Sequence, residues 1–135
     1  MNSHEPSKIL IVDDEPGLLF SLCAYLEDDG FIVKTTISGE DALEALAKEH
    51  FDAVIIDIRL PGKDGNDVIF EAVKAGTSAA FFIHTGSTDY QIPQSLKQLG
   101  FSSENIFLKP ILDLDSFCKT LRLRLKKTAF SKKNA

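Results

Sequence analysis

Residues 9–14 read ILIVDD, four consecutive apolar residues followed directly by two carboxylates. An unbroken apolar run is typical of a strand buried on both faces, and such strands belong to parallel sheets covered by helices. Three more runs have the same design: AVII before Asp57, AAFFIH before Thr85, and IFL before Lys109. Because parallel strands end at one edge of their sheet, these polar side chains are predicted to meet in a crevice at that edge.

Helical patterns alternate with the apolar runs along the whole chain. The predicted strands cover residues 8–13, 31–36, 53–57, 79–84 and 106–108. Helices are expected to begin near Pro16, after Ser38, after the turn segment LPGKDG, near Pro93 and near Leu114. This alternation predicts a doubly wound α/β fold, with a five-stranded parallel sheet, helices on both faces and right-handed crossovers.

Two of the expected helices need comment. The second is predicted to turn Ala42, Leu43, Leu46 and Ala47 toward the core. The fourth is expected to be short, from near Pro93 to Leu99, because Pro93 would break a helix that began at Thr88. Either the loop after Thr85 is long or a separate turn precedes this helix.

The length and the N-terminus limit the class of protein. A chain of 135 residues suits one domain and leaves no room for a second folded domain. The start, MNSHEPSKILIVDDE, lacks the basic region of a signal peptide. No apolar run is long enough to span a membrane. These features predict a cytoplasmic protein with no membrane partner.

Charge is distributed unevenly along the chain. The net charge is −5, but residues 1–115 carry 8 basic and 20 acidic residues, a balance of −12, and seven basic residues follow. The basic end could bind nucleic acid. The preferred interpretation is that cations near the end of a C-terminal helix complement its macrodipole. We therefore expect no direct contact with nucleic acid, and residues 128–135 are expected to be a short disordered basic tail.

The cysteines and one histidine are interpreted as packing residues. Cys23 and Cys118 lie at core-facing positions of helical patterns and not in a pair with metal-ligand spacing. His84 precedes Thr85 on a strand, so its side chain should point to the opposite face of the sheet.

The crevice residues have a common chemistry. Asp13, Asp14 and Asp57 would repel one another if they converged without a cation. Magnesium resolves this repulsion, because it prefers carboxylate, water and phosphate oxygens. Asp57 is then a candidate nucleophile toward phosphorus, with Lys109 as a second cation for the phosphoryl oxygens and the Thr85 hydroxyl as a hydrogen-bond donor.

Each of these residues also has a simpler interpretation. Asp13 and Asp14 could be charges at a helix N-terminus, and Asp57 could cap a loop. Thr85 could be a turn residue, and Lys109 a surface cation before a helix. Their joint occurrence in this order, each at a strand end, favours a site that handles phosphate.

The motifs ILIVDDEP, DAVIIDIRLPGKDG, FFIHTGS and IFLKP together resemble the receiver domain of two-component response regulators, over residues 8–127. The resemblance implies the strand order 2-1-3-4-5. It implies that Asp57 accepts a phosphoryl group from a histidine kinase or phosphotransfer protein. It also implies a cis bond between Lys109 and Pro110.

The resemblance further implies how the ligands are shared. Asp14 and Asp57 would bind Mg²⁺ through their side chains, Asp13 would act largely through water, and the backbone carbonyl of Arg59 would complete the protein ligands. Thr85 would move toward the phosphoryl group, and Lys109 would pair with it.

One position departs from the family. Receivers usually carry Tyr or Phe three residues before the lysine, and here that residue is Ile106, whereas Phe107 should face the opposite side of the strand. We therefore predict that output depends on residues 86–99 more than on a rotamer change at Ile106. Arg59 and Ser87 are expected to flank the mouth of the site, where Arg59 would shield the phosphoryl group from water.

The predicted function is a phosphorylation switch that alters binding to a downstream protein or output domain and catalyses only its own phosphorylation and slow dephosphorylation. The chain could also be a receiver excised from a larger regulator or hybrid kinase, or a docking module that needs no phosphorylation. A metal-dependent phosphohydrolase is a further class, although such an enzyme commonly has an Asp where this chain has Arg59. Two copies could pair through the face after the fourth strand, which carries Tyr90, Ile92 and Phe101.

Overall fold

The computed structural model of the chain describes the backbone of residues 6–133 and the side chains of residues 6–126. Its five strands form one parallel sheet in the order β2-β1-β3-β4-β5. The strands are β1 (Lys8–Val12), β2 (Ile32–Thr36), β3 (Ala53–Ile56), β4 (Ala80–Thr85) and β5 (Ile106–Leu108). The predicted fold class and strand order are confirmed.

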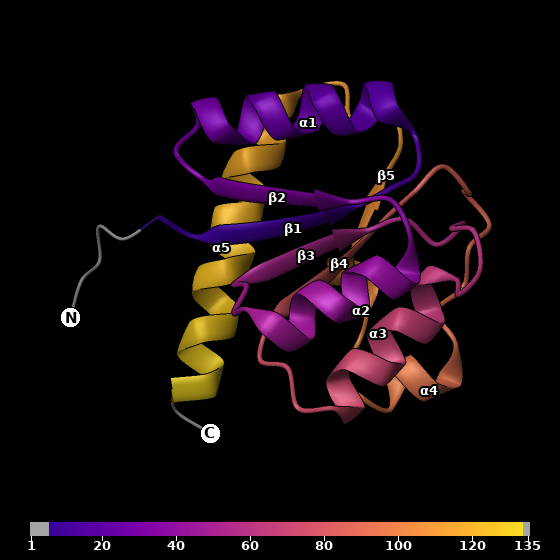
Figure 1. Cartoon of the computed structure of the whole chain (residues 1–135). Helices are drawn as coiled ribbons and strands as arrows, with labels where there is room; N and C mark the ends of the chain where they lie inside the picture. The colour runs from indigo at the N-terminus through magenta and orange to yellow at the C-terminus, as the bar shows by residue number, and fades with distance from the viewer. Residues whose placement is uncertain (1–5, 134–135) are drawn as a thin grey trace.

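Helices cover both faces of the sheet. They are α1 (Pro16–Asp28), α2 (Gly39–Lys48), α3 (Gly65–Lys74), α4 (Gln94–Lys97) and α5 (Leu114–Lys133), with a 3-10 turn at Ser103–Asn105 before β5. Figure 1 shows α1 and α5 on one face and α2, α3 and α4 on the other. All strand arrows point to the same side, where the loops after β1, β3 and β4 gather.

Alternate residues of the central strands feed two apolar clusters. In β1, Ile9 and Ile11 pack in the cluster beneath α1 and α5, whereas Leu10 and Val12 pack in the cluster beneath α2, α3 and α4. Full burial of such a side chain contributes roughly 1.5–3 kcal/mol relative to exposure. The unbroken apolar runs of the sequence therefore reflect burial on both faces, as predicted.

Local capping residues determine where the helices begin. Pro16 occupies the first turn of α1, and the Ser38 hydroxyl accepts a hydrogen bond from the Asp41 amide at the start of α2. Asp64 caps α3 in the same way through the Asp67 amide.

One predicted core residue of α2 is not in the core. The prediction that Ala47 faces inward is wrong, because Ala47 is exposed and Ala45 is buried in its place.

The fourth helix is short because the loop before it is long. Residues 86–93 contain no helix, but they include a turn in which the Tyr90 amide donates to the Ser87 carbonyl, and α4 begins directly after Pro93. The loop is therefore long, and it also contains a separate turn. The loop connects the end of β4, at the edge of the sheet where the predicted site lies, to the start of α4.

The C-terminal helix extends beyond the predicted boundary. Helix α5 continues to Lys133, so residues 128–133 differ from the predicted disordered tail, and residues 134–135 lie outside the described residues. No Gly or Pro follows Pro110 to end the helix. Cys118 is buried as predicted, whereas Cys23 is only half-buried. Over the described residues, no helix has both the length and the apolar character needed to cross a bilayer.

Candidate functional site

Three carboxylates converge where the central strands end. Asp13 follows β1 and Asp57 follows β3, and both are buried, with exposed fractions of 1% and 7%. Together with the exposed Asp14, each offers a carboxylate oxygen, and these oxygens lie within 4.8 Å of one another. A cluster of hard oxygen donors of this kind fits Mg²⁺.

Backbone amides hold the two buried carboxylates in place. The Asp57 amide donates to the Val12 carbonyl at 2.9 Å, and Asp57 Oδ1 accepts from the Arg59 amide at 3.2 Å. Asp13 Oδ1 accepts from the Glu15 amide at 3.0 Å. Each carboxylate therefore keeps its other oxygen, Oδ2, directed to the centre of the site.

The ammonium of Lys109 lies among these acids. Its Nζ is 2.8 Å from Asp13 Oδ2, 3.1 Å from Glu15 Oε1 and 3.3 Å from Asp57 Oδ2. Lys109 is held by its own amide, which donates to the Thr85 carbonyl at 2.8 Å, and its bond to Pro110 is cis, as predicted. Burial alone would lower the pKa of Lys109, but hydrogen bonds to Asp13 and Glu15 outweigh burial and raise the pKa above its ordinary value.

The pKa of Asp57, the candidate nucleophile, is raised above its ordinary value. Burial raises the pKa of Asp57; the Arg59 amide and Lys109 oppose that effect, and Asp13 adds to it. A single ammonium therefore does not fully compensate the buried acids. The arrangement favours an additional cation, and a divalent ion supplies the charge that is lacking.

Glu15 was missed by the sequence analysis. Its side chain is largely exposed, and it reaches Lys109 from the N-cap position of α1. The only signal in the sequence is its place directly after Asp13-Asp14, which does not reveal that the lysine side chain extends to it.

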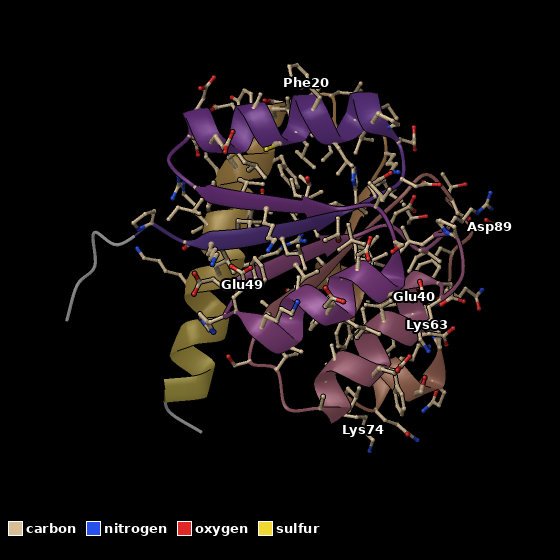
Figure 2. All side chains as sticks on the ribbon, in the orientation of Figure 1. Phe20, Glu40, Glu49, Lys63, Lys74 and Asp89 are labelled. Carbon is tan, nitrogen blue, oxygen red and sulfur yellow. The ribbon has the colours of Figure 1, made fainter. Side chains whose placement is uncertain are left out.

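The polar residue at the end of β4 is tied to the loop that follows it. Thr85 is buried, and its Oγ1 accepts from the Ser87 amide at 3.1 Å. Ser87 Oγ in turn donates to Asp89 Oδ1 at 2.6 Å. Figure 2 shows Asp89 on this loop, at the side of the molecule toward which the strands run.

Arg59 and Ser87 lie on the two loops that adjoin the acidic cluster. Arg59 is exposed and Ser87 is half-buried. The Ser87 hydroxyl is the main cause of a lowered pKa for Asp89, and the Arg59 guanidinium contributes to the same effect.

His84 and Phe107 face away from this loop system. His84 is buried with no hydrogen-bond partner for Nε2, and burial, assisted by Lys109, lowers its pKa to about 4. Phe107 packs in the cluster beneath α1 and α5, with its ring centroid 5.7 Å from Phe82 and 4.6 Å from Phe117. Ile106 packs in the opposite cluster, so the predicted orientations of all three strand residues are confirmed.

The family model described as the response regulator receiver domain matches residues 9–122. The chain belongs to this family of receiver domains. Receivers are phosphoacceptor switches and not conventional enzymes, which argues against the phosphohydrolase class.

Two curated relatives of different length match this chain. Transcriptional regulatory protein GlrR of Escherichia coli K12 is 32% identical over 127 residues, which cover 94% of this chain and 28% of GlrR. Sporulation initiation phosphotransferase F of Bacillus subtilis is 31% identical over 108 residues, which cover 80% of this chain and 85% of that protein. The chain thus spans less than a third of the first relative and most of the second.

A solved receiver structure matches in three dimensions. Response regulator protein TrrA of Thermotoga maritima, in complex with Mg²⁺–BeF, has a TM-score of 0.71 and 28% identity, covering 90% of this chain and 98% of that one. In the present chain, the cluster of Asp13, Asp14 and Asp57 is consistent with Mg²⁺ binding.

Proposed function

We propose that Asp57 is the phosphoacceptor of this receiver. A carboxylate oxygen of Asp57 would attack the phosphorus of a phosphohistidine, forming an O–P bond as the N–P bond breaks, and the imidazole of the donor leaves with the bonding electron pair. The observation that carries the proposal is the position of Lys109 Nζ, 3.3 Å from Asp57 Oδ2. An ammonium so placed can neutralise charge on the transferring phosphoryl oxygens.

The remaining residues would assist in defined ways. Asp14 and Asp57 would hold Mg²⁺ directly, Asp13 through water, and the Arg59 carbonyl would complete the protein ligands. The ion would supply positive charge for the phosphoryl oxygens. The Thr85 hydroxyl would donate a hydrogen bond to the phosphoryl group and carry the signal into the loop after β4.

The partners follow from the reaction class and from the relatives. A histidine kinase or phosphotransfer protein would supply the phosphoryl group in the cytoplasm. The phosphorylated receiver would then change its affinity for a downstream protein or for an output domain. Residues 8–127 would form the receiver, and slow hydrolysis of the aspartyl phosphate would reset it.

The face expected to pair two copies is partly buried within the receiver itself. Tyr90, Ile92 and Phe101 are half-buried and pack against the cluster beneath α2, α3 and α4. They contribute to the core of the receiver as well as to its surface, so pairing of two copies has no strong support from them.

The test is the intact-protein mass after incubation with Mg²⁺ and acetyl phosphate, for the parent chain and for Asp57→Asn. A phosphoryl adduct in the parent alone is the expected result. An adduct in both proteins would mean that Asp57 is not the acceptor. No adduct in either, with Mg²⁺ binding verified, would favour a docking module.

A further inference from the structure

A tyrosine on the loop after β4 is hydrogen-bonded to the first turn of α3, the helix that follows the phosphoacceptor in the chain. The Tyr90 hydroxyl, on the loop after β4, donates to Asn66 Oδ1 in the first turn of α3 at 2.6 Å. The Tyr90 ring is half-buried against the cluster beneath α2, α3 and α4. Burial, together with Asp64, raises the pKa of this phenol to about 12, as expected for a hydroxyl held inside a packed contact.

The Asn66 end of this bond lies beside the backbone of Asp57. Asn66 follows Gly65, whose amide donates to the Ile58 carbonyl at 2.9 Å. Gly65 packs so closely on Asp57 that a Cβ at this glycine would lie 2.4 Å from the Asp57 carbonyl oxygen. The first turn of α3 therefore packs directly against the backbone of the phosphoacceptor.

The Tyr90 end is connected to Thr85. The Tyr90 amide donates to the Ser87 carbonyl at 3.4 Å, and the Ser87 amide donates to Thr85 Oγ1 at 3.1 Å. A displacement of Thr85 toward Asp57 would act directly on the Ser87 amide and, through Ser87, on Tyr90. Ile106 and the Tyr90 ring pack against the same cluster. Because Ile106 is aliphatic, Tyr90 is the residue of this pair that places an aromatic ring on this face of the sheet.

We propose that Tyr90 is a positioning residue for Thr85, and that its hydrogen bond to Asn66 holds the loop in the unphosphorylated arrangement and is released when Thr85 moves to the phosphoryl group. This inference rests on the proposed function. A bond present only in the unphosphorylated state opposes the switch, so its removal should tighten binding of a phosphoryl analogue. A neutral hydrogen bond of this kind predicts a change of about two- to tenfold.

The test is the affinity of Mg²⁺-loaded protein for beryllofluoride, compared among the parent, Tyr90→Phe and Asn66→Ala. Tyr90→Phe keeps the ring and removes only the hydroxyl. The matched control is Tyr25→Phe, which alters the chain's other tyrosine, a residue that packs on the opposite face of the sheet. The double variant completes a cycle, and its effect should equal that of either single variant, because both remove the same bond.

A spectroscopic measurement separates this role from a merely structural one. In protein labelled with ¹³Cζ-tyrosine, the Tyr90 resonance, assigned by its absence from Tyr90→Phe, should shift when beryllofluoride binds, and the Tyr25 resonance should not. Equal affinity in Tyr90→Phe and Tyr25→Phe, with an unmoved Tyr90 resonance, would overturn the inference and leave the proposed function intact. Failure of the parent to bind beryllofluoride would overturn both.

Discussion

Lys109, at the end of β5, reaches across the edge of the sheet to Asp57, at the end of β3, so that the two side chains meet 52 residues apart in sequence with Nζ 3.3 Å from Oδ2. This pair lies in a site with more buried negative than positive charge. The excess is useful for binding a divalent cation and unfavourable for the stability of the metal-free protein.

Asp57→Asn should stabilise the metal-free protein. The native pKa of Asp57 is raised by burial, so above that pKa its ionised form costs folding free energy. At pH 7 we expect a gain on the order of 1 kcal/mol, a size common for substitutions that relieve functional strain. The gain should shrink as pH falls through the native pKa, where the parent carboxyl becomes protonated. Urea unfolding of both proteins in chelator between pH 4 and 7 measures this, and a less stable Asn variant would contradict it.

Magnesium should stabilise the parent and not the variants that lack a ligand. At a concentration of 100 times the dissociation constant, a ligand that binds only the folded state adds about 2.7 kcal/mol. Asp14→Asn should lose most of this increment, as should Asp57→Asn. Asp28→Asn, which alters an exposed acid at the end of α1, is the matched control and should keep it. Thermal unfolding with and without Mg²⁺ measures the difference, and an equal increment in Asp14→Asn would argue against its role as a ligand.

The fold and the meeting of the acidic residues were predictable for one physical reason. Strands buried on both faces leave continuous apolar runs, and parallel strands bring their C-terminal ends to one edge, so the residues directly after each run had to converge. The side-chain contacts across that edge were not predictable. The Lys109–Glu15 pair and the Tyr90–Asn66 bond depend on how far a side chain extends and on how a loop is folded, and neither property leaves a pattern in the sequence.

Two predictions about helices were wrong, one about which face of α2 is buried and one about where α5 ends. Ala45 and not Ala47 faces the core, because Ala47 lies five residues after the buried Ala42, roughly 140° around the helix, whereas Ala45 lies three residues after it, roughly 60° away. Helix α5 continues to Lys133 because Leu, Lys and Arg are good helix formers and no breaking residue intervenes.

Arg59→Ala should shorten the life of the aspartyl phosphate. Arg59 is exposed two residues after the phosphoacceptor, on the loop that follows β3, where its side chain can exclude attacking water. We expect hydrolysis to accelerate by up to about tenfold, equivalent to about 1.4 kcal/mol of barrier. Lys63→Ala, on the same loop, is the charge-matched control. Decay of the phosphoryl adduct by intact mass gives both rates, and an unchanged rate in Arg59→Ala would refute the shielding role.

His84 should make the protein sensitive to acid. Burial, with Lys109, lowers its pKa from 6.5 to about 4, so between these values the unfolded state binds more protons than the native state. The free energy of unfolding is therefore not reduced by His84 above about pH 6.5. As pH falls toward 4, it decreases by roughly 3 kcal/mol at most. His84→Leu removes the buried imidazole and should flatten this part of the profile, whereas His50→Gln, at an exposed histidine, should not. If urea unfolding gave His84→Leu the same loss of stability between pH 6.5 and 4.5 as the parent, the acid sensitivity would have to come from the carboxylates alone.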